Sequence, residues 1–133
     1  MELSIDTLHA QHDALRELIA ILRERLQVAR HGTEIPVAAL AEQTAQLLDT
    51  LLEHIDAEDA ILDPVLRQKR GDAVADAMTA HHHAQRDAFQ QTIKALRGGE
   101  LATAYMVTAL EDIMGELARD MEHEEKNLFP TAE

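Results

Sequence analysis

The chain has 133 residues, the size of one compact domain with room for a buried core, and we expect a single domain over residues 1–133. Its formal net charge of -13 argues against nucleic acid or an anionic membrane surface as a partner. The absence of cysteine excludes disulfides, thiolate zinc sites and thiol catalysis. No stretch has the apolar length of a membrane span, and no basic-then-apolar leader opens the chain, so we expect a soluble cytoplasmic protein.

Apolar residues recur at spacings of three and four in four successive segments, which is the pattern of amphipathic helices. The four stripes cover residues 5–26, 40–65, 74–96 and 106–128. Turn-forming or helix-ending residues follow them: His31-Gly32-Thr33, Gly71-Asp72, Gly98-Gly99 and Pro130. Ser4 is the expected N-cap of the first helix, and Pro36 suits the first turn of the second. Four helices with short connections predict an all-α, antiparallel up-down-up-down four-helix bundle.

The second and fourth segments repeat one another. At a constant offset of 66 residues, the series His54, Glu58, Leu62 and Pro64 returns as Asp120, Glu124, Leu128 and Pro130. The first and third segments match more loosely at an offset of 70, where Leu8, His12 and Arg16 correspond to Met78, His82 and Arg86. Helix pairs related in this way place equivalent positions at one level on opposite walls of a shared core. The repeat therefore favours a site with two centres.

Six polar residues interrupt the apolar stripes at positions where leucine would continue them. They are His12, His54, Glu58, His82, Asp120 and Glu124. His12 and His82 come early in their helices, and the other four residues come late in theirs. An antiparallel bundle therefore brings all six to the same end. His54 and Glu58 are four residues apart and therefore share one helix face. We expect the six side chains to form one layer of the core.

Such a layer is unfavourable without a counter-charge. Three carboxylates in an apolar core repel one another, and each uncompensated buried charge costs several kcal/mol. The stripes contain no lysine or arginine to neutralise them. Imidazole together with carboxylate suits iron, manganese or zinc. We therefore expect a dinuclear metal site bridged by Glu58 and Glu124, in which the three histidines and Asp120 cap the two metals.

Two alternatives stay open at this point. Arg16 and Arg86 each follow a core histidine by four residues and could form buried ion pairs with Glu58 and Glu124. That arrangement would give a metal-free module acting through protein contacts. The other alternative is a mononuclear or zinc-bound site without redox chemistry. The remaining histidines are expected at boundary or surface positions: His9, His31, His81, His83 and His123. Of these, His123 is the best spare ligand.

Four segments resemble the hemerythrin-like HHE cation-binding family over essentially the whole chain. LLEHIDAEDAILDPVL resembles the HxxxE-xxx-LFP element of that family, and HEEKNLFP resembles its second copy. DTLHAQHDALRELI resembles the opening helix, with Arg16 four residues after His12, and HHHAQRDAF resembles the third-helix element. The resemblance implies a non-haem di-iron centre with terminal histidines and two bridging glutamates. It also implies roles in oxygen binding or sensing, nitric oxide and peroxide chemistry, iron handling or stress response.

The sequence departs from that family at two positions. Asp120 stands where the family motif has histidine, and Arg86 stands where an HxxxH pair would continue from His82. A site richer in carboxylate favours sensing, nitric oxide or peroxide reactivity, or plain metal binding over reversible oxygen transport. We expect a metal-binding protein that holds two non-haem iron ions, or manganese or zinc, and takes a small diatomic molecule or peroxide. Catalytic turnover and the oligomeric state stay open.

Overall fold

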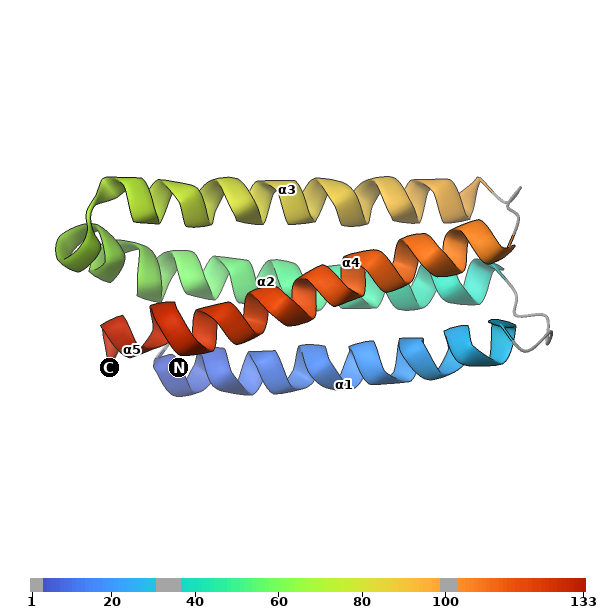
Figure 1. The fold of residues 1–133 in the computed structure, drawn as a ribbon, viewed down its shortest axis with the longest axis horizontal. Helices are drawn as coiled ribbons and strands as arrows, with labels where there is room; N and C mark the ends of the chain where they lie inside the picture. Colours follow the sequence, from blue (N-terminus) through green and yellow to red (C-terminus); the bar gives the residue numbers. More distant parts are fainter. Residues whose placement is uncertain (1–3, 31–36, 99–102) are drawn as a thin grey trace.

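A computed structural model describes residues 4–30, 37–98 and 103–133, and four long helices dominate it (Figure 1). The helical elements are α1 (Ile5–Arg30), α2 (Val37–Arg70), α3 (Asp72–Arg97), α4 (Thr103–His123), the π-helical turn η1 (Glu124–Leu128) and α5 (Phe129–Ala132). Successive long helices run in opposite directions, and both chain ends lie at the same end of the bundle (Figure 1). The predicted antiparallel four-helix bundle is confirmed. The expected turn at 31–33, Pro36 and Gly99 lie outside the described residues.

Local sequence explains where the helices begin and turn. Ser4 caps α1 as expected, because its Oγ accepts from the backbone N–H of Thr7 at 3.4 Å. Gly71 separates α2 from α3 with a φ of 96°, a left-handed conformation that favours glycine. Its backbone N–H donates to the carbonyl of Leu66 at 3.0 Å, which satisfies one of the last free acceptors of α2.

The end of the fourth helix differs from the expectation that Pro130 closes it. The chain stays helical through Pro130, but the turn before it widens into the π-helix η1. The backbone N–H of Phe129 donates to the carbonyl of Glu124, five residues earlier. Proline has no N–H, and its ring collides with the carbonyl four residues before it, so a regular α-turn is disfavoured at this point. Because the wider turn holds an extra residue, Glu124, Leu128 and Phe129 are all buried.

The polar layer divides the apolar core into two clusters. In α1, His12 lies between Leu8 of the shorter cluster and Leu15 of the longer one. In the fourth helical segment, Glu124 lies between Met121 and Leu128 in the same way. The shorter cluster, next to the chain ends, consists of Leu8, Ala57, Leu62, Leu66, Ala75, Met78, Leu128 and Phe129. Polar side chains at this level are therefore covered by apolar packing on both sides.

The buried stripes of two helices are rotated slightly from the predicted ones. Near the end of α2, Leu62 and Leu66 are fully buried, whereas Ile61 and Val65 lie half-buried at the edge. Neighbouring helix positions are separated by about 100°, so a broad apolar face includes both and packing selects the centre. The same rotation in α4 has a consequence for the site, described below. Within the described part of the chain, no helix combines the length and apolarity needed to cross a membrane.

Candidate metal centre

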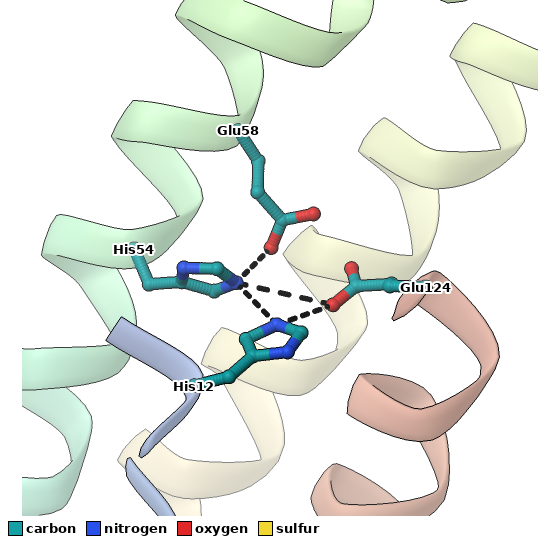
Figure 2. Close-up of side chains that lie close together, drawn as sticks. All are labelled: His12, His54, Glu58 and Glu124. Carbon is teal, nitrogen blue, oxygen red and sulfur yellow. Dashed lines mark hydrogen bonds and ion pairs between the residues drawn. The ribbon is translucent and has the colours of Figure 1, made fainter. Parts of the chain in front are cut away.

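Four buried side chains from three helical segments converge at the polar layer. His12 comes from α1, His54 and Glu58 from α2, and Glu124 from the start of η1 (Figure 2). One nitrogen or carboxylate oxygen of each lies within 4.8 Å of the corresponding atoms of the other three. A cluster of two imidazoles and two carboxylates at this spacing is suited to hold a metal ion.

The two histidines present Nε2, and the two glutamates present Oε1, to a common centre. His54 Nε2 lies 2.5 Å from Glu58 Oε1 and 2.9 Å from His12 Nε2. Glu124 Oε1 lies 3.1 Å from His12 Nε2 and 3.9 Å from His54 Nε2 (Figure 2). The short separation of His54 and Glu58 follows from their spacing of four residues on one face of α2.

His82 of α3 faces the same two carboxylates from the other side. Its Nε2 lies 3.6 Å from Glu58 Oε2 and 3.5 Å from Glu124 Oε2. Each carboxylate therefore directs one oxygen to His12 and His54 and the other to His82. Both ring nitrogens of His82 and Oε2 of Glu58 are buried without a hydrogen-bond partner among the described residues. Leaving such atoms unpaired is costly, and metal ions bound between the helices would satisfy them.

The outer nitrogens of two histidines are fixed by hydrogen bonds. His12 Nδ1–H donates to Glu125 Oε2 at 2.9 Å, and His54 Nδ1–H donates to Gln11 Oε1 at 2.8 Å. Because both partners are oxygen acceptors, the proton of each neutral ring lies on Nδ1 and the lone pair on Nε2. Such outer partners orient histidine ligands in metal sites. The side chains of His12 and His54 are thus held in the tautomer that metal binding requires.

Sequence reasoning missed the two residues that supply these acceptors. The side chain of Glu125, which is not a member of the apolar stripe, is half-buried against His12 and also accepts from Arg16 at 2.7 Å. No periodic signal marks Gln11, which lies at the edge of the stripe of α1. Glu125 lies in the π-helical turn that precedes Pro130.

The arginines do not neutralise the buried carboxylates. Arg16 pairs with Glu125 and, at 3.7 Å, with Asp13, and its side chain is 42% exposed. Arg86 lies on the surface side of α3, with its Nη2 3.1 Å from His83 Nδ1. The contacts found among the described residues therefore give no support to the alternative in which arginines fill the polar layer.

Asp120 lies apart from the four-residue cluster. Its Oδ2 is 2.6 Å from His81 Nε2 and accepts from the amide of Gln85 at 2.5 Å, so the carboxylate joins α4 to α3. Asp120 is only half-buried, and Met121 takes the core position beside it. The expectation that Asp120 replaces a core leucine is therefore wrong, because the broad apolar face of α4 is centred on the next residue.

The other histidines lie at the edge of the site or away from it. His123, the best spare ligand by sequence, is exposed, and its Nδ1 is 3.0 Å from the side-chain amide of Asn127. His9 packs edge-on against Phe129 with ring centroids 5.1 Å apart. His81 contacts Asp120, as described above, and His31 lies outside the described residues.

At the centre, burial and neighbouring charges shift the pKa values of the ionisable side chains in opposite directions. Burial lowers the pKa of His54, but the carboxylates of Glu124 and Glu58 outweigh it and raise that pKa to about 9. The same balance raises the pKa of His82 to about 10. Burial raises the pKa of Glu124, yet hydrogen bonds from the surrounding histidines hold it well below its ordinary value. The site therefore strongly favours ionised carboxylates with positive charge between them.

Comparison with known proteins agrees with a cation site built from these buried histidines and glutamates. The family described as the hemerythrin HHE cation binding domain matches residues 3–132. No curated protein and no solved structure matches the chain. The match covers nearly all of the sequence, and the buried histidine and glutamate cluster is of the kind that holds a cation. The chain belongs to the hemerythrin HHE cation-binding domain family.

Proposed function

We propose that this protein, as a single domain over residues 1–133, holds two non-haem iron ions and binds, senses or reacts with oxygen, nitric oxide or peroxide. His12 and His54 would cap one metal, and His82 and Asp120 the other. Glu58 and Glu124 would bridge the two. The ligand set also suits manganese and zinc, so the choice of iron rests on the family and is open to direct test.

The proposal rests on the positions of the two carboxylate groups, each of which directs its two oxygens towards histidines on opposite sides of the site. Glu58 and Glu124 each direct Oε1 towards the pair His12 and His54, and Oε2 towards His82. A single metal would need only one of these oxygen pairs. The second pair, together with the ring nitrogens of His82 that make no hydrogen bond among the described residues, favours two metals that share both carboxylates.

Asp120 is the sixth proposed ligand because its carboxylate lies one helical turn before Glu124. Its contacts with His81 and Gln85 are those of a carboxylate held by outer partners, as His12 and His54 are held by Glu125 and Gln11. Asp120, together with His81 and Gln85, would complete the side of the centre that faces His82.

Iron bound here would supply electrons and open coordination positions for a small oxidant or diatomic molecule. The residues around the site cover it and orient its histidines. The two apolar clusters cover the polar layer along the bundle on both sides. Gln11 and Glu125 hold the rings of His54 and His12 in place, so that the site needs little reorganisation on binding.

Metal analysis and an optical spectrum of protein purified without chelators test the proposal. We expect about two iron ions per chain and near-ultraviolet bands of an oxo bridge. Glu58→Ala and Glu124→Ala should each abolish metal loading. Matched controls are Glu53→Ala and Glu122→Ala, which change exposed glutamates on the same helical segments, and His31→Ala.

Three outcomes contradict parts of the proposal. Protein that stays metal-free after iron supplementation would exclude the metal site altogether. One metal per chain would restrict it to a mononuclear centre. Loading that survives both Glu58→Ala and Glu124→Ala would mean that the site lies elsewhere in the chain.

A further inference from the structure

A cavity of about 450 Å³ lies between α3 and the fourth helical segment and reaches the polar layer. Its walls are mainly apolar, and they include Val74, Ala77 and Met78 of α3 and Leu128 of η1. His82 and Glu124 lie among its lining residues, whereas His12 and His54 do not. This cavity therefore reaches the centre from the side that faces His82.

Among the lining residues of the cavity is His82, whose buried ring nitrogens make ion-pair contacts but no hydrogen bond among the described residues. His82 is 4% exposed. Asp120 and His81 also line the cavity, where they pair with each other. An apolar pocket with a few polar groups converging at one end is the usual form of a small-molecule site.

The size of the cavity exceeds what a diatomic molecule requires. A water molecule takes about 30 Å³ of liquid volume, so a molecule of two heavy atoms would leave most of the space empty. Pockets for organic ligands range from about 300 to 1,000 Å³. The apolar wall formed by Val74, Met78 and Leu128 would bury a hydrocarbon group favourably.

We propose that this cavity binds a small organic molecule with an apolar body and one oxygen-bearing head group, the class of short alkyl or aryl hydroperoxides and alcohols. The apolar body would lie against Val74, Ala77 and Met78. The head group would point to His82 and Glu124. This inference rests on the proposed function, since it names the side on which the metal centre receives its ligand and the kind of ligand it receives.

Benzyl alcohol is a suitable unreactive probe, and glycerol is its fully polar counterpart. Binding is measured by NMR titration of the methionine methyl groups on both metal-free and zinc-loaded protein. We expect benzyl alcohol to shift the signal of Met78, which lines the cavity, and to leave that of Met114, buried in the longer cluster, unchanged. Glycerol should shift neither signal.

Ala77→Phe fills the cavity from an exposed position and should weaken benzyl alcohol binding at least tenfold. The control Ala95→Phe places the same ring on an exposed position of α3 outside the lining, and should leave the affinity unchanged. Both variants should load as much zinc as the parent protein. Equal helix-propensity costs make the pair well matched.

Each outcome of this experiment has a separate meaning. Undiminished probe binding in Ala77→Phe, or glycerol binding as tightly as benzyl alcohol, would overturn the inference. Failure of the parent protein to load metal would instead overturn the proposed function. The titration of metal-free protein still decides in that case whether the cavity binds the organic probe, so the two failures can be told apart.

Discussion

The Nε2 atoms of His12 and His54 lie 2.9 Å apart at the centre of the bundle. The Nδ1–H of each ring donates outwards, to Glu125 and Gln11 respectively, so in the neutral rings two lone pairs face each other. This arrangement is repulsive unless a proton or a cation lies between the rings. The hydrogen bonds that hold the rings in this orientation therefore favour metal binding before any metal arrives.

Glu125→Gln tests the importance of this orientation. The amide keeps the size of the side chain but removes the charge that pairs with His12 and Arg16. Loss of such an outer partner typically lowers metal affinity by about 10- to 100-fold. Competition with a chelator of known affinity measures the change. Glu122→Gln is the control, because Glu122 is exposed and pairs only with Lys126 in the described ion pairs. Equal affinity in both variants would deny Glu125 this role.

Asp120→Ala tests the sixth proposed ligand. We expect iron content to fall from two ions to about one per chain, because the His12 side of the centre keeps all of its ligands. Asp120→His should restore full loading, since imidazole suits the same metals. Glu116→Ala, an exposed change one helical turn earlier, is the control. Full loading of Asp120→Ala would mean that Asp120 is not a metal ligand and only contacts His81 and Gln85.

The stability of the metal-free protein should depend on pH. Despite burial, the neighbouring carboxylates raise the pKa values of His54 and His82 from 6.5 to about 9 and about 10. A raised folded-state pKa stabilises the fold fully below the unfolded value and ceases to do so as pH passes through the folded one. Glu124, with a lowered pKa, stabilises the fold above about pH 4.5.

Urea unfolding of metal-free protein should therefore show its highest free energy of unfolding between about pH 4.5 and 6.5. The value should fall by a few kcal/mol towards pH 10. The decline should be smaller in His82→Gln, which removes one of the two raised groups. A flat profile from pH 6.5 to 10 in the parent protein would contradict the charge balance described for this layer.

Phe129→Ala should destabilise the end of the bundle that carries the site. The ring is fully buried in the shorter cluster and lies against His12 with ring centroids 4.9 Å apart. Truncating a buried phenylalanine typically costs about 3 to 5 kcal/mol, part of it from the cavity left behind. Thermal and denaturant unfolding measure the loss. Tyr105→Ala, at an 80% exposed position, should change stability by about 0.5 kcal/mol or less.

Periodicity alone was enough to predict the bundle and most of the buried polar layer. His12, His54, Glu58, His82 and Glu124 all occupy buried positions, as their places in the apolar stripes indicated. Spacings of three and four define a helix face, and helix faces are local properties of the sequence. The internal repeat also indicated the pairing of Glu58 with Glu124 that the structure shows across the centre.

Tertiary packing decided the details that give the site its form. Asp120 and Met121 fit the stripe of α4 about equally well, because both lie about one turn from Leu117 and from Glu124. Packing against α3 selected Met121 for the core and turned Asp120 towards His81.

Residue spacing alone specified four amphipathic helices and the buried histidines and glutamates on them, because the helical period is encoded residue by residue. Only the tertiary structure revealed the π-helical turn before Pro130, the acceptors Gln11 and Glu125, and the cavity beside His82. The two acceptors and the cavity arise where separate helices meet. Contacts between residues more than 40 positions apart leave no periodic trace in the chain.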